Sequence, residues 1–114
     1  MTAAELIALA DELVPNALSE GAKLGLVNEI ESKIQMQIFL VQAKDIQSIQ
    51  AEDADTEELC LPEARRSLYL AWMRCMIYWY QGEYEIYENE RAMFETEWTA
   101  CMRDECDAAH RGTG

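Results

Sequence analysis

Few side chains in this sequence have the types and the spacing that catalysis or metal binding requires. Cys101, Cys106 and His110 form a Cys-x4-Cys-x3-His pattern, which could present three zinc ligands along one helix. Structural zinc sites usually have a tighter cysteine pair and a fourth ligand, and His110, the only histidine, lies in a tail that ends in Gly-Thr-Gly. No serine or cysteine has a histidine at a motif spacing, and no glycine-rich phosphate loop occurs. We therefore expect no metal, no cofactor and no catalytic residue.

Carboxylate pairs are the other residues that could do acid-base chemistry. Glu83 and Glu85 are two residues apart, as are Glu88 and Glu90. Side chains at this offset point to different faces of a helix, so each pair is better explained as surface charge. Six methionines and ten aromatic residues could line a ligand pocket, but at helical spacing they are more typical of a core or an interface. The sequence therefore predicts that this protein is not an enzyme.

Net charge is the strongest bias in the composition. The 114-residue chain has a formal charge of −13 at pH 7. Residues 52–63 carry six acids and no base, and residues 83–97 carry six acids against Arg91 alone. Because gripping a nucleic-acid backbone needs clustered lysines and arginines, we expect no direct grip on DNA. The acids are consistent with a solvated face, with a surface for a basic partner, or with a wall that DNA passes without sticking.

The elements that must position these residues are predicted to be helices. Thr2 and Glu5 fit a capping box, and a first helix is expected from about residue 3 to residue 14. Pro15 and Asn16 end it, because proline disfavours the helical conformation in the residue before it. The stripe that this helix is expected to bury is Leu6, Ile7, Ala10 and Leu13.

A second helix is predicted from about residue 20 to residue 41, with Ser19 as its cap. Residues 35–42 also alternate between apolar residues and glutamines, as a strand would, although the helical period upstream favours a helix. The stripe that the second helix is expected to bury is Leu24, Val27, Ile30, Ile34, Ile38 and Val41.

An acidic loop, about residues 42–61, interrupts the helical pattern. Its AEDADTEE segment has the composition of a mobile loop, and loops of this length are usually functional or disordered. Pro62 suits the first turn of a third helix. Gly82 fits either a turn between two antiparallel helices or a small residue inside one long helix, and Asn89 is a second possible cap.

The chain is expected to form one all-α domain, residues 1–114, with a flexible tail from about 108 to 114. Its fold is a small helical bundle with a short N-terminal helix, a second helix, the acidic loop, and a long C-terminal helix or helical hairpin. No stretch approaches the roughly 20 apolar residues that span a bilayer, and the N-terminal segment lacks the basic region of a signal peptide. We therefore expect a cytoplasmic origin without a disulfide framework, and Cys75 and Cys101 are interpreted as small core residues.

Large apolar and aromatic side chains recur at helical spacing in the C-terminal half. One stripe is Leu68, Trp72, Cys75, Met76 and Trp79, and a second is Ile86, Met93, Phe94, Trp98, Cys101 and Met102. Tyrosines lie beside these stripes, where a ring can be buried while its hydroxyl stays hydrated, as is favoured at protein interfaces. This pattern is typical of a protein that holds other proteins, and the candidate interface residues are Trp72, Tyr78, Tyr80 and Tyr84.

Several short motifs share an order with a known family. The segment DELVPNALS, residues 11–19, is followed by LVNEIE at residues 26–31, which resembles the opening of small tailed-phage head-tail connector (adaptor) proteins. Leu-Tyr, Gly-Glu, Tyr-x-Asn and Met-Phe motifs in the second half are similar to the same family, although Glu90 stands where a second asparagine is usual and the acidic loop does not align. The residues that carry the resemblance are Leu13, Pro15, Asn16, Asn28, Glu29, Leu68, Tyr69, Gly82, Tyr87, Asn89 and Phe94.

The resemblance implies a virion protein of the head-tail neck, made in the host cytoplasm. Such a subunit forms a homo-oligomeric ring, dodecameric in the family, between the portal protein and a downstream neck or tail-completion protein. DNA passes through the ring during ejection without being gripped, and no membrane is involved. An acidic lining would suit that passage, and the candidate lumen or partner-facing acids are Glu52, Asp53, Asp55, Glu57, Glu58, Glu83, Glu85, Glu88 and Glu90.

Two other functions fit the same charge excess. A small acidic helical inhibitor could mimic DNA and occupy the basic cleft of a nuclease or regulator, and its binding would weaken steeply with salt. A helical interaction module with an unidentified partner is the third hypothesis. A connector differs from both because it remains in the finished particle.

Overall fold

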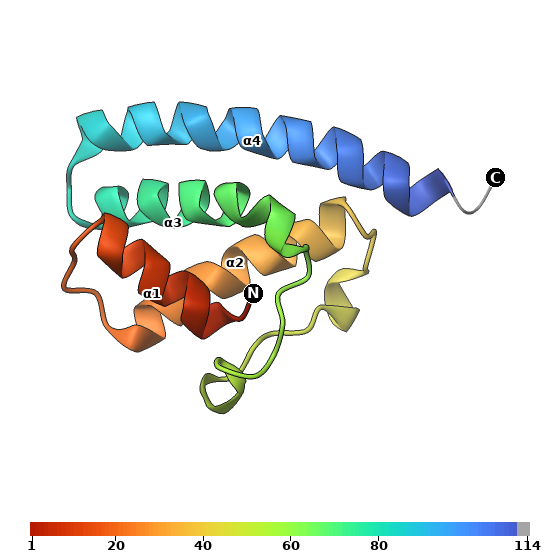
Figure 1. Cartoon of the computed structure of the whole chain (residues 1–114), viewed down its shortest axis with the longest axis horizontal. Helices are drawn as coiled ribbons and strands as arrows, with labels where there is room; N and C mark the ends of the chain where they lie inside the picture. Colours follow the sequence, from red (N-terminus) through yellow and green to blue (C-terminus); the bar gives the residue numbers. More distant parts are fainter. Residues whose placement is uncertain (112–114) are drawn as a thin grey trace.

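The computed structural model describes the backbone of residues 1–111 and the side chains of residues 1–108. In that part, three 3-10 turns and no strand accompany the helices α1 (Ala3–Leu13), α2 (Glu20–Gln37), α3 (Arg66–Tyr80) and α4 (Tyr84–Arg111) (Figure 1). The predicted all-α bundle is confirmed, and its C-terminal part is a helical hairpin. Helix α4 continues past residue 108, where a tail was predicted. The side chain of His110 and residues 112–114 lie outside the described part.

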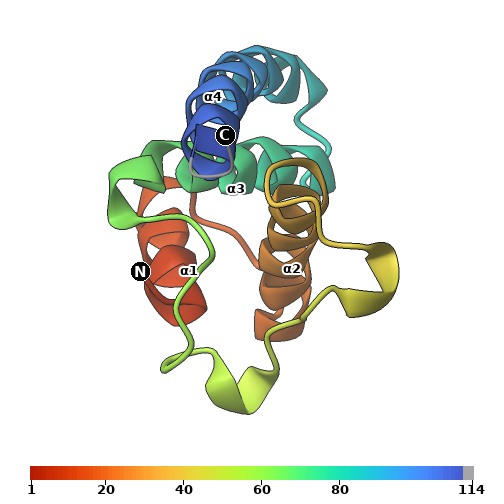
Figure 2. The same cartoon turned by 90° about the vertical axis from the view of Figure 1, so that its right-hand side faces the viewer.

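Helix α3 lies in the middle of the molecule. Helix α4 runs antiparallel along one side of α3, while α1 and α2 lie against the other side (Figure 1). Turned by 90°, the molecule has α4 alone at its upper edge and α1 and α2 on opposite flanks below, with the acidic loop beyond them (Figure 2). One hydrophobic core joins all four helices.

Helix α1 begins as its sequence predicts. Thr2 is extended, and its Oγ1 accepts from the Glu5 N–H at 3.2 Å, which satisfies one of the free amides of the first turn. Leu6, Ile7 and Ala10 are buried as expected. Leu13 is not, since it is 51% exposed and Val14 takes the core position instead. The reason is that α1 ends at Leu13 and the chain turns to an extended conformation at Val14.

Asn16 organises the turn that follows α1. Its Nδ2 donates to Asp11 Oδ1 and to the Val14 carbonyl, both at 2.9 Å, and its Oδ1 accepts from the Leu18 N–H at 3.1 Å. Buried Lys23 donates from α2 to Asp11 Oδ2 at 2.9 Å. Burial raises the pKa of Asp11, but the hydrogen bonds from Asn16 and Lys23 outweigh it and hold that pKa below its usual value. The predicted Pro-Asn turn is therefore a tightly bonded link between α1 and α2.

Helix α2 ends at Gln37, before the predicted end at residue 41. Ser19 caps its start as expected, accepting from the Ala22 N–H at 3.1 Å. Beyond its end, Leu40 has a φ of 57°, and the Val41 N–H returns to the Gln35 carbonyl at 2.8 Å. This left-handed residue reverses the chain, so neither a longer helix nor a strand forms at residues 35–42.

Gly82 is the turn between α3 and α4, and Asn89 lies inside α4. Gly82 has a φ of 78°, a conformation that side chains disfavour. The Glu83 N–H donates to the Tyr78 carbonyl at 3.0 Å and the Gly82 N–H donates to the Trp79 carbonyl at 3.1 Å. These two bonds form a Schellman motif, which ends α3 and fixes where the hairpin turns.

Aromatic rings fill the contact between α3 and α4. Phe94 is buried, with its ring centroid 5.3 Å from that of Trp72 and 6.2 Å from that of Trp98. The Lys33 ammonium of α2 lies over the Trp98 ring, 4.8 Å from its centroid, which favours a cation-π contact. Cys101 is buried in the same layer, as is Cys75 on α3, which confirms both as core residues.

Candidate interaction surfaces

Side chains from one face of α2 hold the acidic loop, residues 42–61. Asn28 brackets one loop residue, donating to the Ile49 carbonyl at 3.0 Å and accepting from the Ile49 N–H at 2.8 Å. Gln35 binds Gln47 in the same way: its Nε2 donates to the Gln47 carbonyl at 3.1 Å, and its Oε1 accepts from the Gln47 N–H at 3.2 Å. These paired bonds satisfy the backbone groups of Gln47 and Ile49 and hold that part of the loop against α2. The AEDADTEE segment, for which the composition predicts mobility, begins two residues after Ile49, and that prediction stays a prediction.

A buried carboxylate lies between these two amides on α2. Glu31 is 3% exposed, and its Oε1 accepts from the Tyr69 hydroxyl at 2.5 Å while its Oε2 accepts from the Cys60 N–H at 2.8 Å. The Tyr69 hydroxyl accepts in turn from the Leu61 N–H at 3.1 Å. Burial, and then the adjacent Glu31 carboxylate, raise the pKa of Tyr69 far above its usual value. Tyr69 is thus a core residue with a dry hydroxyl, rather than one beside the core with a hydrated hydroxyl.

Cys60 should react slowly with thiol reagents although its residue is exposed. Burial of the thiol, and then the hydrogen bond and charge of Glu31, raise its pKa to about 12. The thiolate is the reactive form, so at pH 8 we expect modification about tenfold or more slower than for a cysteine of ordinary pKa. Timed alkylation followed by peptide mass spectrometry measures this rate. The same reaction in urea is the control, and a native rate equal to the unfolded rate would contradict the prediction.

The two acidic segments lie on opposite faces of the molecule. The acidic loop is below α1 and α2, whereas α4 forms the upper edge (Figures 1 and 2). Eight of the nine candidate acids are exposed, namely Glu52, Asp53, Asp55, Glu57, Glu58, Glu83, Glu85 and Glu88. One subunit therefore cannot turn both segments toward a single passage.

Glu90 is the exception among the candidate acids, because it is 8% exposed. Its Oε1 accepts from Arg74 Nη2 at 2.8 Å, across the hairpin. Glu90 Oε2 and Arg74 Nε are buried and have no hydrogen-bond partner among the described residues. The prediction of a surface carboxylate at Glu90 is therefore wrong, since the pair with Arg74 draws it between α3 and α4.

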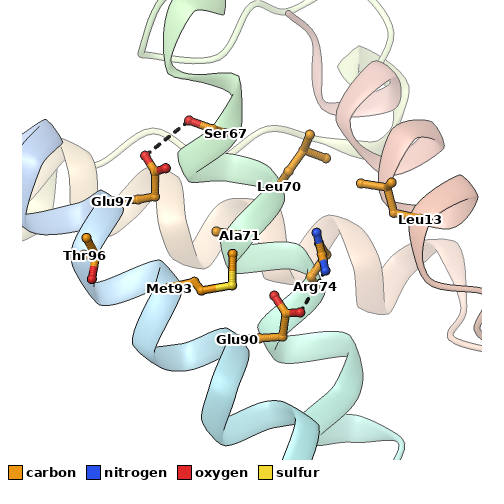
Figure 3. Close-up of a pocket in the computed structure, with 9 residues that line it drawn as sticks. All are labelled: Leu13, Ser67, Leu70, Ala71, Arg74, Glu90, Met93, Thr96 and Glu97. Atoms are coloured by element: carbon orange, nitrogen blue, oxygen red, sulfur yellow. Dashed lines mark hydrogen bonds and ion pairs between the residues drawn. The ribbon is translucent and has the colours of Figure 1, made fainter.

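This ion pair lines a groove of about 390 Å³ between α1, α3 and α4 (Figure 3). Leu13 and Leu70 point toward each other on one side, and Met93 points from α4 toward α3 (Figure 3). Leu13 and Met93 are both more than half exposed. We call this feature the α1-side groove, a largely apolar hollow with an incompletely bonded ion pair in its wall.

Two clusters of exposed apolar residues lie elsewhere. The α2 end consists of Met36, Phe39 and Leu40, which are 46%, 42% and 62% exposed. The hairpin end consists of exposed side chains on either side of the α3–α4 turn, namely Trp79, Tyr80, Tyr84 and Ile86. Figure 1 places the hairpin turn and the C-terminal end of α2 at different ends of the bundle. Apolar clusters of this kind are typical of surfaces that bind other proteins.

Replacing Leu40 by glycine should raise the free energy of unfolding by about 1 kcal/mol, because glycine adopts a φ of 57° without the steric strain of an L side chain. The Leu40 side chain is 62% exposed, so little apolar burial is lost. Chemical denaturation of both proteins measures the difference. Gly82→Ala is the control in the opposite direction: it introduces a side chain at a φ of 78°, so it should lower the free energy of unfolding. A Leu40→Gly protein less stable than the native one would contradict the expectation.

The predicted interface aromatics divide into two groups. Tyr80 and Tyr84 are exposed and stay candidates. Trp72 and Tyr78 are only partly exposed and pack against the core, and the Trp72 indole N–H donates to the Leu26 carbonyl at 2.9 Å. Sequence reasoning missed the α2 end, whose alternation with glutamines was the available signal.

The residues that carry the family resemblance have mostly structural positions. Leu68, Tyr69 and Phe94 are buried, while Asn16, Asn28 and Gly82 hold turns or the loop. The remaining ones are exposed or partly exposed, namely Leu13, Pro15, Glu29, Tyr87 and Asn89.

Neither a metal cluster nor a membrane span is found in the part of the chain that the structure describes. No three His, Cys, Asp or Glu residues gather there as a metal site would need, and all four cysteines are free thiols. Its helices are too short or too polar to cross a bilayer. No family model, curated protein or solved structure matches this chain.

Proposed function

We propose that this chain is a structural subunit of a head-tail connector ring in a tailed bacteriophage. In the virion it would join the portal protein to a downstream neck or tail-completion protein. The sequence motifs point to the family. The observation that carries the proposal is that two different apolar surfaces, the α1-side groove and the α2 end, belong to helices α1 and α2, which Figure 2 places on opposite flanks of one small bundle.

Subunits of a closed ring need two unlike surfaces that fit each other, because each contact is head-to-tail. The two flanks of this molecule differ in their side chains: one has the groove with the Arg74–Glu90 ion pair in its wall, and the other has Met36, Phe39 and Leu40 beside a second hollow. The outline in Figure 2 narrows from the flanks α1 and α2 to the single helix α4. A wedge of this kind suits a ring with α4 toward its axis. The hairpin end remains free for a partner above or below the ring.

Helix α4 is the better candidate for the wall of the passage. Its 28 residues span about 42 Å, and most of its carboxylates are exposed. Such a wall repels the DNA backbone, so DNA slides past without binding. The acidic loop, on the opposite face, would then lie on the outside of the ring.

Reversing the charge of α4 should slow DNA ejection from assembled particles severalfold, because lysines in the passage would attract phosphates. The variant changes Glu85, Glu88 and Glu95 to lysine, all exposed on α4. The matched control makes the same charge change on the acidic loop, at Glu52, Asp53 and Asp55. Ejection is followed by release of dye-labelled DNA. Equal effects of the two variants would remove α4 from the passage.

The decisive experiment is quantitative mass spectrometry of purified virions or DNA-filled heads, with the portal protein as reference. We expect peptides of this chain in a fixed, ring-like ratio to the portal. Absence from particles, together with abundance in the infected-cell lysate, would refute the connector role. It would favour the acidic DNA mimic, whose binding to a basic enzyme would weaken steeply with salt.

A further inference from the structure

A second hollow, of about 380 Å³, lies between the α2 end and the acidic loop. We call it the loop-side hollow. Part of its wall is apolar and comes from Phe39, Val41 and Ile49. Phe39 is 42% exposed whereas Ile49 is buried. A side chain that entered the hollow would therefore meet an accessible aromatic ring and an apolar wall.

Carboxylates are the only charged side chains that line the loop-side hollow. They belong to Glu31, Glu57 and Glu58. The N-terminal ammonium pairs with Glu58 and offsets its charge. Glu31 and Glu57 form no ion pair with any described residue. Two negative charges in the wall are thus left without a cation.

Glu31 is the buried one of these two carboxylates. Its partners are the Tyr69 hydroxyl and the Cys60 N–H, which are both neutral donors. Buried carboxylates are usually paired with a cation as well. A ligand need not touch Glu31, because a charge in a poorly hydrated wall acts over several ångströms. Glu57, by contrast, is exposed and can bond a ligand directly.

The Cys60 thiol also lines the hollow and responds to its charge. Burial is the largest cause of its raised pKa, the hydrogen bond and charge of Glu31 come next, and the charge of Glu57 adds to them. Both carboxylates therefore disfavour an anion at this position, and by the same interaction they favour a cation.

The lysines nearest in the sequence do not supply that cation. Lys33 places its ammonium over the Trp98 ring of α4. Lys44 is exposed, is followed by the acid Asp45, and is not part of the wall. The negative charge of the hollow is therefore available to a partner.

An arginine side chain fits these walls better than other cations do. Its planar guanidinium stacks on an aromatic ring and bonds a carboxylate with two N–H groups, while its stem packs on apolar atoms. A metal ion would need several ligands close together, and no such cluster occurs among the described residues. Met36 and Leu40 extend the apolar surface beside the hollow, as expected for a cation that a protein presents.

We propose that the loop-side hollow binds an arginine side chain of a partner protein, with the guanidinium between the Phe39 ring and the Glu57 carboxylate. Met36 and Leu40 pack against apolar residues that flank this arginine. In the proposed ring the acidic loop lies on the outside, so the hollow is open to a protein other than the neighbouring copy. The inference goes beyond the connector role and does not depend on it.

Peptide titration of the full-length protein tests the site. The probe is a capped Leu-Arg-Leu peptide, followed through the backbone amide NMR signals of Gln47, Ile49 and Cys60, which line the hollow. We expect saturable shifts of these signals. The same peptide with citrulline, a neutral side chain of the same shape, should bind about tenfold more weakly. Absence of saturable shifts, or equal affinity of the two peptides, would overturn the proposal.

Substitutions on the protein side locate the contact. Glu57→Gln should weaken binding of the arginine peptide about tenfold, and Phe39→Leu severalfold. Both residues are exposed, so the fold should be kept. Glu52→Gln is the matched control, because it makes the same charge change on the same loop outside the hollow. Equal effects of Glu57→Gln and Glu52→Gln would show attraction to the loop in general and overturn the site.

The same variants identify other occupants. Arg66 is an exposed arginine that forms no ion pair with a described residue. Self-association that both Glu57→Gln and Arg66→Gln abolish in analytical ultracentrifugation would assign the hollow to a second copy and overturn the proposed partner. Peptide binding by a chain that is absent from virions would support the hollow and refute the connector.

Discussion

Replacing Glu31 by alanine is expected to lower the free energy of unfolding by about 3 kcal/mol. The carboxylate is 3% exposed and accepts from both the Tyr69 hydroxyl and the Cys60 N–H. Alanine leaves both donors without a partner and opens a cavity beside the ring. A small domain has only about 5–15 kcal/mol of stability in total, so this loss is severe. Urea denaturation followed by circular dichroism measures it.

The control for this prediction lies on the same helix. Glu29 is exposed, so Glu29→Ala should leave the denaturation midpoint nearly unchanged. Tyr69→Phe removes the same hydrogen bond from the other side. Because the two substitutions share one interaction, the double variant should lose less stability than the two single variants added together. If the Glu31→Ala protein had the same denaturation midpoint as the Glu29→Ala protein, the buried hydrogen-bond network would not be stabilising.

The second large effect concerns the ion pair in the α1-side groove. Arg74→Met should destabilise the protein by about 2 kcal/mol, since it leaves the Glu90 carboxylate buried without a cation. The value is below that of a fully buried pair because the Arg74 side chain is 35% exposed. Adding Glu90→Met should recover most of the loss, because an apolar pair of similar volume replaces the buried charge. Thermal and urea denaturation of Arg74→Met, Glu90→Met and the double variant measure the cycle.

Arg91→Met is the matched control for Arg74→Met. Arg91 pairs with Glu95 at 3.1 Å on the exposed side of α4, and both side chains are more than half exposed. We expect no measurable change in stability from this substitution. If the double variant Arg74→Met/Glu90→Met were as unstable as Arg74→Met alone, the loss would come from packing of the arginine rather than from the unpaired carboxylate.

Local signals in the sequence were sufficient for most of the fold. The caps at Thr2 and Ser19, the Pro-Asn turn and the helical period of the C-terminal half all act within a few residues, and each is found in the structure. The sequence left two roles for Gly82, a turn between two helices or a small residue inside one long helix. The choice between them depended on whether a positive φ was needed, which only the packing of α4 back onto α3 decides.

The candidate surfaces could not be predicted, because they depend on partners far apart in the sequence. Glu90 belongs to an acidic run that looks solvated, and Arg74 meets it only when the hairpin closes. A polar stripe on α2 resembles an exposed helix face, and its members are Asn28, Glu31 and Gln35. In the structure these side chains bind the backbone of the acidic loop, which lies 12 to 29 residues further along the chain. Leucine rarely adopts a positive φ, so no residue pattern indicates the reversal at Leu40.

Gln35 takes part in two hydrogen-bonded features, the anchoring of the acidic loop and the chain reversal after α2. Its side chain brackets Gln47 of the acidic loop, and its carbonyl accepts from the Val41 N–H that closes the reversal around Leu40. The acidic loop and the reversal around Leu40 are therefore held by one shared residue. Ordering Gln35 lowers the entropic cost of ordering both segments, so the loop and the reversal are thermodynamically linked.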